Sequence, residues 1–191
     1  LTRFNLLFPE KRDFFLEGQG IFAFGGRSLA GRGSGGDSDD VPIMFFSRQV
    51  GLANGRTVPV IGGGRVTGKT GKYDIAALNI ETARSQTAGV DPTNFTAIRV
   101  RRDILRRSNV GVIATARHPG ADSNTSLLMG ADASFRLSQN NTVLGYYTRT
   151  DRVGGSGQAD SYRARFDYAG DRYGLGVEHL LVGEGFAPEV G

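Results

Sequence analysis

The residues best suited to chemistry in this sequence lie in the glycine-rich run Gly63–Thr70. This run matches the phosphate-binding P-loop pattern, in which backbone amides and a lysine hold a nucleotide. The segment Ser126–Asp132 further resembles the apolar run that ends in a magnesium-holding aspartate. These strings alone indicate a P-loop nucleotide hydrolase, whose nucleotide-binding residues would be Gly63, Gly68, Lys69 and Thr70.

The residues after the P-loop-like run argue against that interpretation. A P-loop binds phosphate because a helix begins at its Gly-Lys-Thr and points its positive end at the anion. Here Thr70 is followed by Gly71 and Lys72, and a glycine in the first turn makes a poor helix start. The stretch instead favours a hairpin that turns through Lys69–Lys72 into Asp74–Thr82. Since no amphipathic crossover helix is evident downstream, the nucleotide hydrolase is kept only as an alternative.

Other catalytic arrangements are weaker still. His118 and His179 are the only histidines, and neither has metal-ligand spacing to a second histidine. The absence of cysteine excludes a thiol nucleophile, a disulfide framework and cysteine-ligated metal sites. The sequence therefore predicts no catalytic residue, no metal site and no cofactor, and we expect a protein that is not an enzyme.

Composition narrows the class of partner. The formal net charge is +4, and of the 23 basic residues only Lys11, Lys69 and Lys72 are lysines. The arginines are dispersed and no aromatic stacking motif accompanies them, so we expect no nucleic-acid partner. No apolar stretch is long enough for a transmembrane helix. A membrane-spanning strand, however, needs only about 9–11 residues with every second one apolar.

The elements that position these residues alternate with a period of two. The clearest case is Leu127–Ser138, where the even positions are small, polar or charged apart from Leu128. A period of two indicates a β-strand, because successive side chains point to opposite faces. The odd positions of this stretch are all apolar: Leu127, Met129, Ala131, Ala133, Phe135 and Leu137. Similar alternation runs through Thr96–Ile104, Leu144–Arg149, Ser161–Tyr168 and Arg172–Leu181.

The length of these strands and the loops between them indicate the fold class. Several strands alternate over about ten residues or more, whereas an average strand in a soluble protein has about 5–6. Hairpin signals at Gly68–Lys72, Gln139–Asn141 and Gly170-Asp171 alternate with longer loops at Arg84–Pro92, His118–Asn124 and Arg152–Asp160. We therefore predict an all-β fold, a long antiparallel meander of roughly eight or nine strands that is a fragment of an outer-membrane-type β-barrel. A soluble β-sheet interaction module is a second alternative.

The chain is expected to divide near residue 40. Residues 1–40 form a lead-in segment with a helical turn or two in Phe8–Gly18 and a flexible Gly/Ser/Asp loop at Gly31–Asp40. Residues 41–191 form the antiparallel β-barrel segment, which we expect to be an incomplete barrel within a longer protein. The polar strand faces combine arginine with acidic residues, which suits a hydrated lumen, although a purely structural ion-pair role stays open. The lumen-facing candidates are Arg99, Arg101, Asp132, Arg163, Arg165, Asp167 and Glu178.

Several stretches carry a family resemblance. They are Leu1–Gly18, Phe45–Arg48 with Gly51, Gly63–Lys69, Arg101–Ser108, and Asp167–Tyr173 running on to Pro188–Gly191. Together they resemble the C-terminal domain of unknown function in bacterial proteins whose N-terminal part is a family-nine-like carbohydrate-binding module. The resemblance spans essentially the whole chain.

The resemblance implies a non-enzymatic β-barrel domain in the bacterial outer membrane that contacts outer-membrane lipid. It also implies a periplasmic sugar-binding-like module upstream, which these residues lack. Through that module the resemblance implies a part in glycan binding or uptake. It carries over no catalytic residue.

Overall fold

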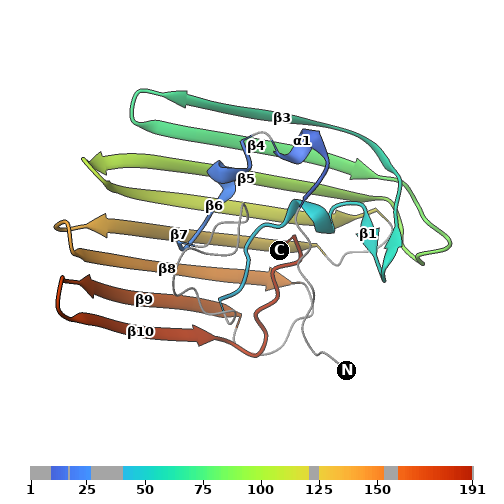
Figure 1. Cartoon of the computed structure of the whole chain (residues 1–191). Coiled ribbons are helices and arrows are strands. Elements are labelled where there is room, and N and C mark those ends of the chain that lie inside the picture. The colour runs from blue at the N-terminus through green and yellow to red at the C-terminus, as the bar shows by residue number, and fades with distance from the viewer. Residues whose placement is uncertain (1–9, 17, 27–40, 121–124, 153–158, 191) are drawn as a thin grey trace.

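The computed structural model describes residues 10–16, 18–26, 41–120, 125–152 and 159–190. Its main feature is one eight-stranded antiparallel sheet, shown from β3 to β10 in Figure 1. The sheet strands are β3 (Val60–Thr70), β4 (Tyr73–Thr82), β5 (Thr93–Leu105), β6 (Ser108–Pro119), β7 (Ser126–Arg136), β8 (Asn141–Arg152), β9 (Asp160–Ala169) and β10 (Gly174–Val182). The remaining elements are short: α1 (Asp13–Leu16), η1 (Gln19–Phe22), η2 (Ser47–Gln49), β1 (Leu52–Ala53) and β2 (Arg56–Thr57).

Each strand of the sheet pairs with its neighbours in sequence, so the topology is a simple meander. This confirms the all-β class and the long antiparallel meander predicted from the alternation. Tight turns join β3 to β4, β5 to β6, β7 to β8 and β9 to β10 at one end of the sheet, and longer connections lie at the other end (Figure 1). The sheet is open, with β3 and β10 as its two edges.

The P-loop-like run lies on edge strand β3 and leads into a hairpin. Lys69 pairs with Asp74 and Thr70 with Tyr73 across the turn. Gly71 has φ +56°, a left-handed conformation that glycine adopts without steric cost. The predicted hairpin is therefore confirmed, and a strand stands where a P-loop would need a helix.

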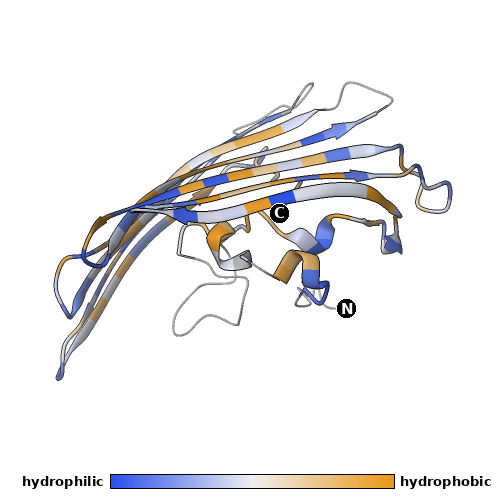
Figure 2. Ribbon diagram, turned by 90° about the horizontal axis from the view of Figure 1, so that it is seen from above, coloured by the Kyte–Doolittle hydropathy of each residue, from blue (hydrophilic) through white to orange (hydrophobic). Residues whose placement is uncertain are grey.

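The sheet is curved, and its two faces differ in what covers them (Figure 2). Residues 10–16, 18–26 and 41–58, called the inner segments below, pack on the concave inner face. Their side chains share one hydrophobic core with side chains of the sheet. The inner segments contribute Phe15, Phe22, Phe24, Val41, Met44, Phe45 and Val50, and the sheet contributes Leu78, Ile80, Phe95, Ile113, Leu128 and Tyr146. Leu128, which breaks the alternation of its strand, is buried in this core.

The structure of residues 10–58, where it is described, agrees only in part with the prediction from the sequence. The predicted helical turn is present as α1, and Gly18 beyond it has φ +71°. The loop predicted at residues 31–40 lies outside the described residues. The sheet begins at Val60 rather than at residue 41, because Pro42, Pro59 and the Asn54-Gly55 turn interrupt a long strand.

A node at the carboxylate of Glu10 joins two of the inner segments, residues 10–16 and 41–58. Glu10 has one local and one distant partner: Arg12 Nη2 donates to Glu10 Oε2 over 2.8 Å, and Ser47 Oγ donates to the same oxygen over 2.8 Å. Arg12 also donates to the backbone oxygens of Ser47 and Val50, each over 2.8 Å. Burial alone raises the pKa of Glu10, but the hydrogen bonds from Arg12 and Ser47 and the charge of Arg12 lower it from 4.5 to about 2.

This node predicts an acid-sensitive contribution to stability. Because the folded-state pKa of Glu10 lies below its unfolded value, its contribution is present above pH 4.5 and is lost as pH falls toward 2. Glu10→Gln is expected to lower the unfolding free energy at pH 7 by about 2 kcal/mol and to flatten the acid dependence between these pH values. Thermal unfolding followed by circular dichroism across this range measures both effects.

The matched control is Glu81→Gln, since Glu81 is exposed on β4 and is expected to change neither quantity. Equal acid profiles for Glu10→Gln and the unaltered chain would contradict the role assigned to the node.

Candidate functional site

The inner face of the sheet carries all seven residues predicted to face a lumen. Their strand positions alternate with the apolar ones, so they project to the same side in register. They lie on four strands: Arg99 and Arg101 on β5, Asp132 on β7, Arg163, Arg165 and Asp167 on β9, and Glu178 on β10. The structure divides them into a buried group under the inner segments and a more exposed group nearer the tight turns.

The centre of the buried group is the ion pair between Arg99 and Asp132. Arg99 is 1% exposed, and its Nη2 lies 2.7 Å from Asp132 Oδ1 and 2.9 Å from Oδ2. The arginine reaches β7 by crossing β6 at Gly111, where a Cβ would lie 2.7 Å from Arg99 Nη1. Gly111 is thus the opening that lets two charges on non-adjacent strands meet.

The same pair holds the backbone of an inner segment. Gly25 N donates to Asp132 Oδ2 over 3.0 Å, and Arg163 Nη1 donates to Gly25 O over 3.4 Å. The ring of Phe24 lies 5.0 Å from Arg99 Cζ, within cation–π range. A Cβ on Gly25 would lie 2.5 Å from the Tyr146 ring, so this backbone rests directly on the sheet wall. The cluster of Arg99, Asp132 and Arg163 is therefore a dock for the inner segment.

Some buried polar atoms of the dock form no hydrogen bond. Among the described residues, Arg99 Nε and Nη1 form no hydrogen bond, and Asp132 Oδ1 has the ion-pair contact with Arg99 Nη2 at 2.7 Å but no hydrogen bond. Buried polar atoms without hydrogen bonds lower the free energy of unfolding. The stability of the dock therefore depends strongly on the ion pair between Arg99 and Asp132.

Ion-pair ladders across neighbouring strands continue from Arg163 of the dock into the more exposed group. Arg163 and Arg165 lie 2.8 and 3.5 Å from Glu178, and Arg165 lies 2.7 Å from Asp167. On the same face but nearer to edge strand β3, Arg101 lies 2.7 Å from Asp74. Lys69 completes this ladder at 3.5 Å from Asp74 and 3.2 Å from Asp103. On the inner face near the tight turns, positive and negative side chains are thus present in nearly equal numbers.

Sequence reasoning missed Asp74, Asp103 and Lys69 as members of the inner face. The tight turn after Thr70 fixes the register that pairs Lys69 with Asp74, so this pair could have been predicted from the sequence. The pairing of Asp74 with Arg101 requires the register of β4 against β5, which a long loop separates.

The remaining candidates fall in places with other roles. Gly63, Gly68, Lys69 and Thr70 lie along β3, and Asp132 at the end of the second nucleotide-like string pairs with Arg99. His118 shares a hydrogen bond of 2.8 Å with Thr125, and His179 stacks on Tyr162 with ring centroids 5.4 Å apart. In the described ranges, no three acidic, histidine or cysteine side chains gather as a metal site would require.

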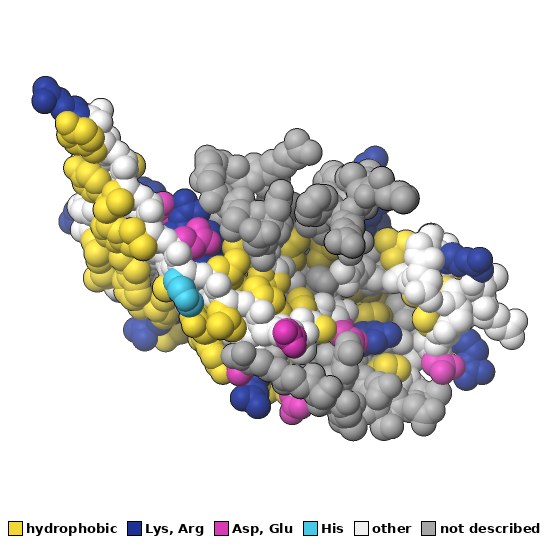
Figure 3. All heavy atoms as spheres, turned by 90° about the horizontal axis from the view of Figure 1, so that it is seen from below, with side chains coloured by type: hydrophobic (Ala, Val, Ile, Leu, Met, Phe, Trp, Pro, Cys, Tyr) yellow, Lys and Arg dark blue, Asp and Glu magenta, His cyan; other side chains and the backbone are white. Residues whose placement is uncertain are grey.

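Apolar side chains predominate on the outer face of the sheet, polar ones such as Glu81 and Arg149 lie toward the ends of its strands, and no other described element covers it. Its side chains come from every long strand and include Ile75, Ile98, Val112, Met129, Leu175 and Val177, each at least 39% exposed. Figure 3, which looks onto the β10 side, shows hydrophobic side chains gathered along this outer surface. No helix in the described part of the chain has the length and apolar character to cross a membrane.

Comparisons of the chain with protein-family models, curated proteins and solved structures find no match. Functional inference therefore depends on the two faces of the sheet: a charged, partly filled inner face and a bare apolar outer face.

The dock generates a prediction about Gly111. Gly111→Val would force Arg99 away from Asp132, and because both are enclosed, a buried charge would lose its partner. We expect a loss of about 3–5 kcal/mol in unfolding free energy, the range for a broken buried ion pair. The measurement is denaturant unfolding followed by circular dichroism.

Gly68→Val serves as the control, since a Cβ at Gly68 on β3 meets nothing within 4 Å. If both valine variants unfolded at the same denaturant concentration, close passage of Arg99 over Gly111 would not matter to stability.

Proposed function

We propose that this chain forms part of the wall of a β-barrel in a bacterial outer membrane, and that it is not an enzyme. The outer face would contact lipid, and the inner face would line a lumen that the inner segments partly fill. The observation that supports this most is the bare apolar outer face, which extends across the long strands of the sheet. Isolated exposed hydrophobic residues are common in soluble proteins, but a continuous apolar surface of this extent marks an interaction surface.

Strand length supports the proposal. β7 has 11 residues, which at about 3.3 Å per residue span roughly 36 Å. Tilted by about 40°, such a strand still crosses the apolar band of about 25 Å typical of outer-membrane barrels. The arrangement of connections, with tight turns at one end and longer loops at the other, is also typical of these barrels.

The distribution of charge supports the same orientation. A soluble two-sheet protein buries the apolar face of each sheet and exposes the charged one. Here the charged face carries the inner segments, and the apolar face has no cover among the described residues. In a barrel wall this arrangement is the expected one, because lipid solvates the apolar face and a polar interior solvates the charges.

The open edges imply a barrel of more than eight strands. An eight-stranded barrel has an interior just wide enough for its own side chains. The inner face here also holds α1, η1 and η2, including the rings of Phe15 and Phe22, and these need additional room. We propose that further strands, outside these residues, pair with β3 and β10 and complete the wall. Glycan binding or uptake stays a prediction of the family resemblance.

Membrane insertion can be tested with one charge placed on each face of β7. Met129 is 56% exposed on the outer face, and Ser134 lies on the inner face of the same strand. Met129→Arg is expected to reduce insertion into phospholipid vesicles by about 2–4 kcal/mol, the cost of an arginine at the bilayer midplane. Ser134→Arg is expected to insert like the unaltered chain. The measurement is flotation with vesicles, resistant to carbonate extraction, of the protein that includes the strands proposed to complete the wall.

Recovery of the unaltered chain in the aqueous fraction without detergent would refute the membrane proposal and favour the soluble β-sheet module. Equal insertion of the two arginine variants would refute the assignment of the outer face to lipid.

A further inference from the structure

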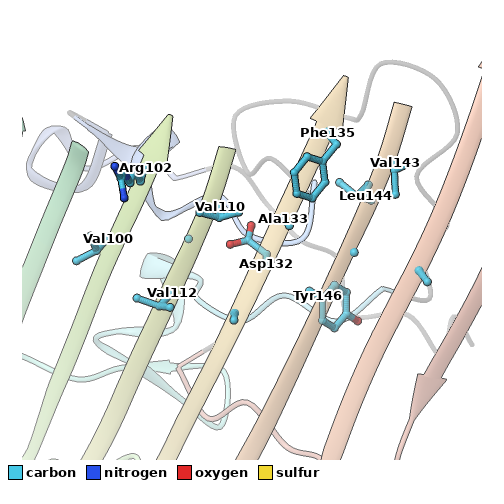
Figure 4. Close-up of a pocket in the computed structure, with 14 residues that line it drawn as sticks. Val100, Arg102, Val110, Val112, Asp132, Ala133, Phe135, Val143, Leu144 and Tyr146 are labelled. Atoms are coloured by element: carbon cyan, nitrogen blue, oxygen red, sulfur yellow. The ribbon is translucent and has the colours of Figure 1, made fainter. Parts of the chain in front are cut away.

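A groove crosses the outer face of the sheet at right angles to the strands. Its floor is one register row of small side chains, because Ala133 on β7 pairs with Gly145 on β8, and Gly145 pairs with Ala164 on β9. Larger side chains border this row, with Phe135 and Val143 on the tight-turn side and Val100 and Val112 on the other (Figure 4). The groove has a volume of about 640 Å³, within the roughly 300–1,000 Å³ of small-ligand sites, and its lining is almost wholly apolar.

The same register row ends at a cation. Ala133 pairs with Val110 on β6, and Val110 pairs with Arg102 on β5, so the small-residue floor leads directly to the arginine. Arg102 lines the groove, and its Cζ lies 5.3 Å from the ring of Tyr73. No carboxylate of the described residues forms an ion pair with Arg102, in contrast to the paired arginines of the inner face.

Two tight turns near Arg102 carry further cations. Asp103 N donates to Lys72 O over 2.8 Å, which places the turn between β3 and β4 beside Arg102. The turn between β5 and β6 consists of Arg106 and Arg107, both exposed. Lys72, Arg102, Arg106 and Arg107 are therefore four exposed cations toward the tight-turn end of β3–β6, and Arg102 is the one of them that lines the groove.

From this juxtaposition we propose that the groove is a binding site for one anionic phospholipid. An acyl chain lies along the Ala133–Gly145–Ala164 row, and the head-group phosphate is held by Arg102 with Lys72, Arg106 and Arg107 beside it. The inference rests on the proposed membrane location and adds to it a specific lipid site. An uncharged apolar occupant would leave the cations without a counterion, whereas a soluble anion would leave the apolar groove bare. Only an amphiphile with an anionic head satisfies both parts.

Tyr73 fits this role. An aromatic ring at the membrane interface beside an arginine sits at the level of the lipid head groups, and it restricts the guanidinium through their cation–π contact. The structure therefore holds Arg102 at the groove mouth in the absence of a carboxylate partner.

The test separates the head-group contact from the groove. The chain in detergent is titrated with phosphatidylglycerol and with phosphatidylcholine, and bound lipid is counted by native mass spectrometry. The unaltered chain is expected to bind one phosphatidylglycerol in preference to phosphatidylcholine. Arg102→Gln is expected to reduce this preference about fivefold, the effect of one interfacial cation on an anionic lipid, with phosphatidylcholine binding unchanged. Ala133→Leu fills the floor and is expected to weaken binding of both lipids.

Two matched controls accompany these variants. Arg172→Gln removes an exposed arginine from the turn between β9 and β10, away from the groove, and Ala114→Leu enlarges a side chain of the outer face that is not part of the groove. Both are expected to bind lipid as the unaltered chain does. Circular dichroism checks that each variant has the same strand content.

The outcomes distinguish this site from the membrane proposal itself. If the variants enter vesicles in the flotation assay but Arg102→Gln keeps the full preference for phosphatidylglycerol, or Ala133→Leu binds both lipids normally, the lipid site is refuted and the barrel wall stands. If the unaltered chain fails to float with vesicles, both proposals are refuted together.

Discussion

The buried ion pair between Arg99 and Asp132 connects the sheet to the segment that covers it. It joins β5 to β7 across Gly111, and through Asp132 Oδ2 it also accepts a hydrogen bond from Gly25 N. Removing either partner would leave an uncompensated charge under the core, which is far more costly than losing a surface ion pair. The curvature of this part of the sheet and the position of Phe24 and Gly25 therefore depend on one another. The ion pair thus links the curved sheet to the segment packed on its concave face.

The period-two alternation of the strands extends this constraint to the outer face. Because side chains alternate along a strand, a charged residue that points into the dock makes its two sequence neighbours point to the outer face. Asp132 on the inner face thus places Ala131 and Ala133 on the outer face. A shift of one residue in register would turn every charge toward the apolar side. The tight docking of Gly25 against Tyr146 and the passage of Arg99 over Gly111 tolerate no such shift. The inner dock thus also determines the row of small side chains that forms the outer groove.

The strands were predictable from sequence because alternation is a local signal. The Leu127–Ser138 pattern and the hairpin after Lys69 both appear in the structure. The inner segments were not predictable, because their packing depends on non-local contacts, such as Glu10 with Ser47 and Gly25 with Asp132. The candidate charges were found from their alternation, but their partners needed strand register across long loops. The turn at Arg106-Arg107 was missed because it contains no glycine, asparagine or proline.

The residues of the nucleotide-like string lie along an edge strand and not at the start of a helix. Gly63 lies beside a register shift between β3 and β4, where a Cβ would come within 2.5 Å of Asn79 O, so backbone approach requires glycine there. Lys69 points to the inner face, as inward charges on edge strands commonly do, and finds Asp74 and Asp103. Gly71 supplies the left-handed turn. Demands of a hairpin at the sheet edge therefore account for Gly63, Lys69 and Gly71, whereas nothing in the structure requires glycine at position 68.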